Sequence, residues 1–175
     1  MGNTGFSDLA RLRVLVVDDD PGFHKVFKTI LRGVGVNDIR VALNASAAFS
    51  EMRASRPDVI FVDWRMEPLD GLDFVRLVRQ AKDSPYPLIP IIMLTGHAEP
   101  HRVKEARDAG VTEFLVKPVS MQSVVARLDE VLYRPRAFIQ APVFVGPDRR
   151  RRIRDYDGLE RRTSGKWPEL PEPGR

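Results

Sequence analysis

Acidic, hydroxyl and cationic side chains follow four short apolar runs of the sequence, at the point where each run ends. They are Asp18, Asp19 and Asp20 after the first run, Asp63 after the third, Thr95 after the fourth and Lys117 after the fifth. Neighbouring carboxylates stay ionised more easily with a cation among them, and oxygen donors without His or Cys suit Mg²⁺. A Lys or a Thr can bind phosphoryl oxygens, and a carboxylate can be the nucleophile. These residue types predict a metal-assisted phosphoryl acceptor.

The apolar runs themselves are predicted strands, at residues 13–17, 39–43, 59–62, 90–94 and 113–116. Apolar residues at helical spacing predict helices at residues 21–31, 45–54, 72–81, 100–109 and 121–132. Asp20 before Pro21 is a start signal for the first of these helices, and Gly33 and Gly110 are predicted stops.

Five such strand–helix units with nearly continuous apolar strands predict an α/β fold with a buried parallel sheet. Right-handed crossovers favour a doubly wound sheet of the flavodoxin-like order 2-1-3-4-5, with five helices on its two faces. In such sheets ligands bind outside the carboxyl ends of the strands. The side chains that follow the strands should therefore converge on one edge of the sheet, where the second strand contributes only Asn44.

Positive charge is concentrated at the end of the chain. The 175 residues carry a net charge of +4, but residues 134–175 alone contain eleven basic and six acidic residues. This segment also contains six of the 14 prolines, and its apolar residues occur in short scraps such as AFI and VFV. Such a composition predicts an extended, disordered basic tail, because too little apolar surface is available to offset the ordering entropy. The rest of the chain is nearly neutral.

The composition also excludes several classes of protein. The chain has no Cys, which removes disulfides, Cys-ligated zinc, iron–sulfur clusters and thiol nucleophiles. No apolar run approaches the length of a membrane span, and the first residues lack the apolar core of a signal peptide. We therefore expect a cytoplasmic protein without a transmembrane segment.

Four segments resemble the motifs of the response-regulator receiver domain of bacterial two-component signalling. In chain order they are VLVVDDDPGFH, VIFVDWRMEPLDG, IIMLTG and FLVKP. The spacing is suitable throughout, so the resemblance covers residues 11–133, with a flexible N-terminus at 1–10 and a Pro/Arg-rich tail at 134–175. The resemblance implies a stand-alone, chemotaxis-Y-like switch. Its partners would be a histidine kinase or histidine phosphotransfer protein and a downstream target protein.

The resemblance also implies a role for the side chains at the predicted edge. Asp63 would be the phosphoacceptor. Asp19 would ligate Mg²⁺ directly and Asp18 mainly through water, with Asp63 and the backbone carbonyl of Arg65 completing the protein ligands. Such a domain assists its own phosphorylation and dephosphorylation but is not an enzyme that turns over a metabolite.

The last two strands would supply the response to phosphorylation. Lys117 would pair with the phosphoryl group, and Thr95 would donate to it and act as the moving switch residue. Phe114 occupies the place of the aromatic rotamer partner. The resemblance further implies that the Lys117–Pro118 peptide bond is cis.

One position departs from the family pattern: Glu67 stands between Met66 and Pro68, although the loop keeps its length. A carboxylate so close to the site would alter its local electrostatics. Arg65 and His97 lie two residues after Asp63 and Thr95, respectively. Their side chains would flank an attacking water and modulate the lifetime of the phosphoryl group.

The basic tail contains a repeated pattern, aromatic-x-Gly-x-acid-Arg-Arg. Its two copies are FVGPDRR, with Phe144, Arg149 and Arg150, and YDGLERR, with Tyr156, Arg161 and Arg162. A Gly-centred turn would place the ring and the arginines on one side. The pattern is compatible with a solvated, disordered tail. The sharper alternative is a duplicated docking motif, in which an aromatic anchor and an Arg pair bind an acidic protein surface, anionic lipid or nucleic acid.

Two other functions are weighed. Asp18–Asp19–Asp20 superficially fits the Asp-x-Asp of a haloacid-dehalogenase-like phosphohydrolase, but Gly22 stands where that family has Thr or Val and the chain has no room for its cap insertions. A DNA-binding regulator could use the four consecutive arginines 149–152. However, the tail lacks the two amphipathic helices of a helix-turn-helix, so the sequence disfavours nucleic acid as a partner.

Overall fold

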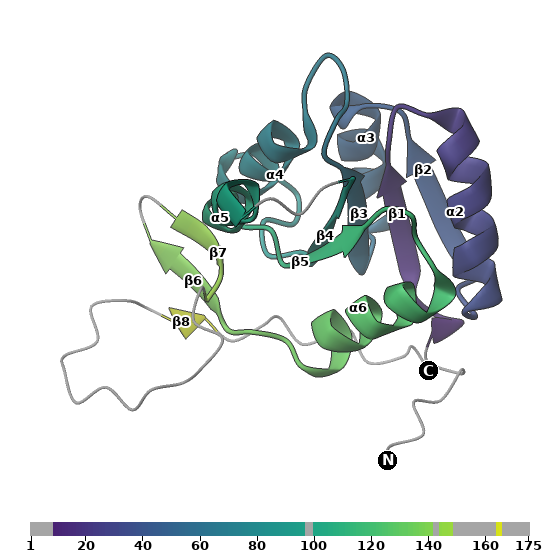
Figure 1. The fold of residues 1–175 in the computed structure, drawn as a ribbon. Coiled ribbons are helices and arrows are strands. Elements are labelled where there is room, and N and C mark those ends of the chain that lie inside the picture. Colours follow the sequence, from purple (N-terminus) through teal and green to yellow (C-terminus); the bar gives the residue numbers. More distant parts are fainter. Residues whose placement is uncertain (1–8, 97–99, 142–143, 149–163, 166–175) are drawn as a thin grey trace.

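The computed structural model describes residues 9–96, 100–141, 144–148 and 164–165. Its main body is a parallel sheet with the strand order β2-β1-β3-β4-β5 (Figure 1). The five strands are β1 (Arg13–Val17), β2 (Asp38–Ala42), β3 (Val59–Asp63), β4 (Ile91–Thr95) and β5 (Glu113–Val116). The predicted α/β class and the doubly wound order 2-1-3-4-5 are confirmed.

Five helices alternate with these strands. They are α2 (Pro21–Gly33), α3 (Ala45–Ser55), α4 (Gly71–Gln80), α5 (Pro100–Ala109) and α6 (Met121–Tyr133). Local capping explains the starts: Asp20 accepts a hydrogen bond from the backbone N–H of Gly22, and Asn44 accepts one from that of Ala47. Gly110 follows α5 with a φ of 103°, a conformation that favours glycine and ends the helix. Within the described residues, no helix has both the length and the apolar character needed to cross a membrane.

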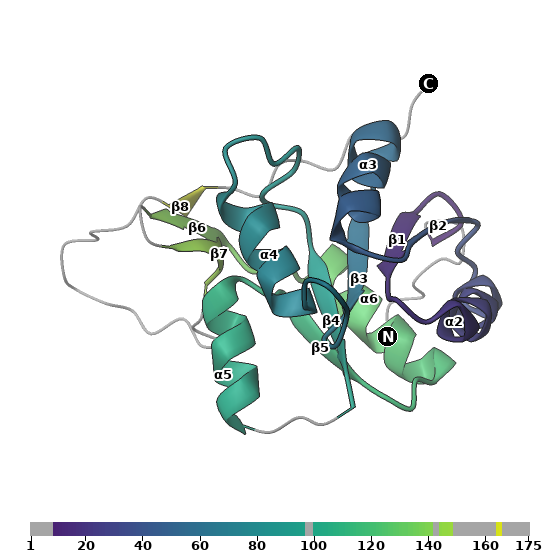
Figure 2. The same ribbon diagram turned by 90° about the horizontal axis from the view of Figure 1, so that it is seen from above.

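The helices cover both faces of the sheet (Figure 2). On one face, α2 and α6 pack against alternate residues of the strands, and on the other α3, α4 and α5 pack against the residues between them. Phe27 of α2, for example, meets Phe61 of β3 edge-on, with ring centroids 5.0 Å apart. Because both faces are covered, β1, β3 and β4 are almost fully buried, which explains why these strands are continuously apolar.

Both ends of the predicted domain extend further than the sequence suggested. Leu9, assigned to a flexible N-terminus at residues 1–10, is buried in the core beneath α2 and α6. The segment after α6 also contains packed structure: β6 (Phe138–Ala141) and β7 (Phe144–Pro147) pair antiparallel, and β8 (Ser164–Gly165) pairs with β6 (Figure 1). The prediction of an extended tail is therefore wrong for this part.

The physical reason is that few apolar residues are enough to order a segment when the main domain already presents a surface on which they can pack. Phe138, Ile139 and Phe144 are buried at 0%, 6% and 9% exposure. The main domain supplies most of the surface that β6 and β7 need, so the hairpin does not have to build a core of its own. A count of apolar residues within the segment alone could not reveal this.

Candidate functional site

The carboxyl edge of the sheet brings together side chains from three strands. Asp63 is the last residue of β3, and one of its carboxylate oxygens, Oδ1, lies 2.6 Å from the Nζ atom of Lys117. The same ammonium lies 3.2 Å from Oδ2 of Asp18, which follows β1. Asp63 is 8% exposed and Asp18 is 2% exposed, so their carboxylates interact with Lys117 largely shielded from solvent. The prediction that these three side chains converge is confirmed by their positions.

Backbone donors hold the carboxylates in place. Asp63 Oδ2 accepts from the backbone N–H of Arg65 at 2.9 Å, and Asp18 Oδ1 accepts from that of Asp20 at 2.8 Å. Asp19 is exposed, and its Oδ2 accepts from the backbone N–H of Glu67 at 3.2 Å. The loop after β1 and the loop after β3 are therefore joined directly at the site.

Burial and charge act against each other at this site. Burial raises the pKa of the Asp18 carboxyl, opposed by the hydrogen bond from the Asp20 N–H and by the positive charge of Lys117. Burial by itself lowers the pKa of the Lys117 ammonium, but the hydrogen bond and negative charge of Asp63, together with Asp18, outweigh it and raise the pKa. Lys117 therefore stays charged across the physiological range.

The two predicted switch residues lie on neighbouring strands. Thr95 is the last residue of β4 and is 4% exposed, and its backbone carbonyl accepts from the N–H of Lys117 at 2.8 Å. Phe114 lies on β5 opposite Met93 of β4, half-buried against the core beneath α3, α4 and α5. The Lys117–Pro118 bond is cis, as predicted.

The loop after β3 carries the departure from the family pattern. Glu67 is exposed, and the Glu67–Pro68 bond is a second cis peptide that the sequence reading did not foresee. This loop forms one wall of a pocket of about 470 Å³, together with Asp19, Trp64 and Arg102. The Arg102 guanidinium of α5 lies over the Trp64 ring, 5.7 Å from its centroid, so α5 contributes to the mouth of the site.

Two further residues shape the geometry of the site. The Lys117 ammonium lies 4.0 Å from the centroid of the Phe23 ring on α2, a residue for which the sequence pattern predicts only an apolar helix position. Gly71 begins α4, and its backbone N–H donates to the carbonyl of Trp64 at 2.9 Å. A Cβ atom at this position would overlap the backbone carbonyl of Asp63. The loop motif VIFVDWRMEPLDG marks the position of Gly71, but nothing in the local sequence signals the contact of Phe23 with Lys117, because these residues are far apart in the chain.

The donor set fits a divalent metal ion that keeps much of its water. Asp18, Asp19 and Asp63 bring three carboxylates against one ammonium, so the site has an excess of negative charge. Among the described residues, however, no three acidic or imidazole groups already gather at metal-binding distance. One or two carboxylates with the remaining positions taken by water is the coordination typical of Mg²⁺.

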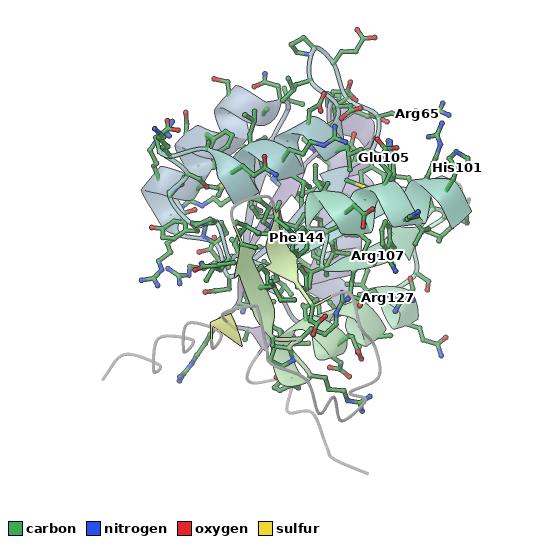
Figure 3. All side chains as sticks on the ribbon, turned by 90° about the vertical axis from the view of Figure 1, so that its left-hand side faces the viewer. Arg65, His101, Glu105, Arg107, Arg127 and Phe144 are labelled. Atoms are coloured by element: carbon green, nitrogen blue, oxygen red, sulfur yellow. The ribbon has the colours of Figure 1, made fainter. Side chains whose placement is uncertain are left out.

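Several of the other predicted site residues can be placed only in part. His97, Arg149, Arg150 and the second tail motif, with Tyr156, Arg161 and Arg162, lie outside the described residues. Phe144 of the first motif is described, and it is buried at the start of β7 (Figure 3). Gly146 of the same motif is within β7 and not in a turn, so the first copy does not present its ring as an exposed anchor.

Comparison with curated proteins finds bacterial relatives, two of which are matched over nearly their whole length. Chemotaxis protein CheY1 of Helicobacter pylori is 34% identical over 122 residues, which cover 69% of this chain and 97% of that protein. Chemotaxis protein CheY-3 of Vibrio cholerae is 27% identical over 123 residues, covering 70% and 93%. The DNA-binding response regulator MtrA of Mycolicibacterium smegmatis is 34% identical over 127 residues, but these span only 53% of its length.

Solved structures agree with the sequence comparison. CheY4 of Vibrio cholerae superimposes with a TM-score of 0.63 at 31% identity, covering 69% of this chain and 98% of that structure. A scan against protein families matches residues 14–129 to the response regulator receiver domain, and this range contains the whole of the site described above. The chain therefore belongs to the receiver-domain response regulators of bacterial two-component systems.

Proposed function

We propose that the chain is a phosphorylation-dependent switch that accepts a phosphoryl group on Asp63. The observation that supports this is the position of the Lys117 ammonium, 2.6 Å from Asp63 and 3.2 Å from Asp18. A charge held there is available to a phosphoryl group on Asp63 without reorganisation. The donor is a histidine kinase or a histidine phosphotransfer protein, and the output passes to a downstream target protein. A cytoplasmic location stays a prediction.

In the transfer, a carboxylate oxygen of Asp63 attacks the phosphorus of the donor's phosphohistidine. An O–P bond forms while the P–N bond breaks, and the electron pair of that bond leaves with the imidazole nitrogen. Lys117 and Thr95 bind the transferred phosphoryl oxygens. Mg²⁺, held by Asp18, Asp19, Asp63 and the carbonyl of Arg65, would neutralise charge on those oxygens when bound.

Loss of the phosphoryl group follows the same logic. A water oxygen attacks the phosphorus, and Asp63 leaves as a carboxylate, so inorganic phosphate is released.

While the phosphoryl group is present, its charge draws Thr95 and Lys117 inward, and Phe114 with α5 and α6 follows. This is a shift of population between two arrangements of one surface. The domain thus assists its own phosphorylation and dephosphorylation and signals through protein contacts.

The proposal is tested by labelling with a small-molecule phosphodonor, acetyl phosphate, in the presence of Mg²⁺. Wild type should incorporate one phosphoryl group, and Asp63→Asn should incorporate none, because the amide cannot act as the nucleophile. Under the haloacid-dehalogenase alternative, Asp18→Asn would be the variant that abolishes labelling while Asp63→Asn is still labelled. Intact mass spectrometry separates the two results.

The proposed modulators are tested on the same labelled protein. Arg65 is exposed in the loop after Asp63, and we expect its side chain to flank the attacking water. Exchanging Arg65 and His97 together for Ala should change the dephosphorylation rate by about tenfold, the effect of about 1.4 kcal/mol on the barrier. If the rate of phosphate release stays that of the wild type, both residues are bystanders.

A further inference from the structure

The hairpin of β6 and β7 is held against the main domain by several independent contacts. Arg136 donates to the backbone carbonyl of Thr112 and lies 3.3 Å from a carboxylate oxygen of Glu113, and its other nitrogen donates to the carbonyl of Asp148. Beyond the hairpin's own strands, β7 contacts α4 and α5 (Figure 3). The hairpin therefore crosses the ends of two helices opposite the site edge.

Two glycines allow this close approach. Gly110 ends α5, and a Cβ atom there would come within 2.7 Å of the carbonyl oxygen of Val145 in β7. A Cβ atom on Gly146 of β7 would come within 2.8 Å of the Cα atom of Gly110. The backbones of β7 and of the turn after α5 are thus in direct contact, and neither could shift by much without breaking the other's packing.

A buried arginine joins the same three elements. Arg79 of α4 is 2% exposed, and its Nε and Nη1 atoms donate to the carbonyls of Gly110 at 3.0 Å and Pro87 at 2.7 Å. Its guanidinium lies over the ring of Phe138 in β6, 5.1 Å from the centroid. Nη2 has no hydrogen-bond partner among the described residues, and burial lowers the pKa of Arg79 to about 9. Burying a charged guanidinium carries a large desolvation cost, and the hairpin that covers Arg79 holds it in this buried position.

Of the five helices that cover the sheet, α5 packs against it with the fewest large apolar side chains. Its sequence is PHRVKEARDA, and among its side chains whose burial the structure describes, residues 101–109, only Ala106 and Ala109 are buried. Two small side chains bury little area, so the free energy that fixes this helix is small. The same helix lies between Thr95 at the end of β4 and the start of β5, and Arg102 reaches the mouth of the site. Contacts at its far end can therefore decide its position.

We infer that residues 136–141 and 144–148 act as a strap that holds α5 against α4 in the unphosphorylated arrangement, and that docking of this strap is coupled to phosphorylation of Asp63. The coupling half of this inference rests on the proposed function. The strap lies outside the matched receiver segment, residues 14–129. Because coupling between two equilibria is reciprocal, loosening the strap favours the phosphorylated state, and phosphorylation loosens the strap. The chain would thus pass its state on to the segment that follows the hairpin.

The first test loosens the strap in the unmodified protein. Phe138→Ala removes the ring over Arg79, and Gly146→Val places a side chain against Gly110. Gln140→Ala, on an exposed position of the same hairpin, is the matched control. In the two strap variants, amide hydrogens of α5 should exchange about 5-fold faster or more, and half-maximal labelling should need about 5-fold less acetyl phosphate. Values equal to those of Gln140→Ala in both variants would overturn the inference.

The second test runs in the opposite direction, on the full chain. Phosphorylation of the wild type should raise amide exchange in β6 and β7 by about 5-fold, while Asp63→Asn treated in the same way should show no change. A wild type that is fully phosphorylated but keeps its hairpin exchange would overturn the coupling and leave the proposed function standing. A wild type that takes up no phosphate would overturn the proposed function, and exchange in α5 of the unmodified variants would still decide whether the strap holds the helix.

Discussion

At the scale of single residues, the site is a balance between burial and charge. Asp18 is 2% exposed, and among the described residues it pairs with one cation, the Lys117 ammonium, which also pairs with Asp63. Two buried carboxylates therefore share one positive charge, which is too little to compensate both. The excess is the electrostatic reason for a site that accepts a metal ion and a phosphoryl group, and it has a measurable cost in stability.

That cost predicts the pH dependence of the unfolding free energy in the absence of metal. The pKa of Asp18 is raised in the folded state above the ordinary 3.8, because burial favours the neutral carboxyl. The contribution of this group to the free energy of unfolding is therefore fully present below pH 3.8 and is lost as the pH rises through the folded pKa. The Asp18→Asn side chain stays neutral at every pH, so this variant should not lose that stability as the pH rises. In urea titrations with a metal chelator, the variant should be more stable than the wild type at pH 7 but not at pH 3.5. Equal stability at pH 7 would contradict the burial argument.

At the scale of elements, the loop from β3 to α4 is the part that holds Asp63 in position. The N–H of Arg65 binds the Asp63 carboxylate, the N–H of Glu67 binds Asp19, and Gly71 starts α4 directly against the Asp63 carbonyl. The loop thus returns to the residue from which it began. Its geometry depends on the absence of a side chain at Gly71 more than on any apolar contact.

Gly71→Ala should therefore destabilise the fold by about 1–3 kcal/mol, because the new methyl group meets backbone that cannot yield as a side chain can. Gly96→Ala is the matched control, since a Cβ atom there has nothing within 4 Å, and it should stay within about 0.5 kcal/mol of the wild type. Urea denaturation of both variants measures the difference. A Gly71→Ala variant as stable as Gly96→Ala would show that the loop can relax.

At the scale of the whole molecule, charge and structure are distributed unequally. The net charge of +4 comes from residues 134–175, whose first part is packed on the main domain through Phe138, Ile139 and Phe144. These apolar residues are occupied within the chain, so they do not serve as the core of an additional binding domain. The rest of this segment, residues 149–175, contains eight arginines, four of them consecutive at positions 149–152.

We accordingly expect no specific binding of duplex DNA by the full chain. The arginines can neutralise phosphates without reading sequence, so any retardation in a gel-shift assay should disappear between about 50 and 200 mM salt. A scrambled duplex of the same length is the control, and it should be retarded to the same extent. Retardation of one sequence at 200 mM salt, with release of the scrambled duplex, would favour the DNA-binding alternative.

The main domain and most of its site could be predicted because the signals are local. Short, nearly continuous apolar runs marked the five strands, and apolar residues at helical spacing marked the five helices. The Asp20–Pro21 pair marked the start of α2, and the fold rule for parallel sheets brought Asp18, Asp63, Thr95 and Lys117 to one edge. The boundaries moved by one or two residues, for instance in β2 and β4, since helix and strand ends depend on capping and pairing more than on pattern.

By itself, then, the sequence determined the element types, the sheet order and the residues that meet at the carboxyl edge, since each of these follows from short-range pattern and chain connectivity. Only the tertiary structure decided where the hairpin packs, how Arg79 is enclosed, and that Phe23 covers the Lys117 ammonium. Those outcomes depend on surfaces made by residues distant in the chain. A short apolar segment such as FI or VFV packs into a sheet only where such a surface exists, and otherwise it stays exposed to solvent.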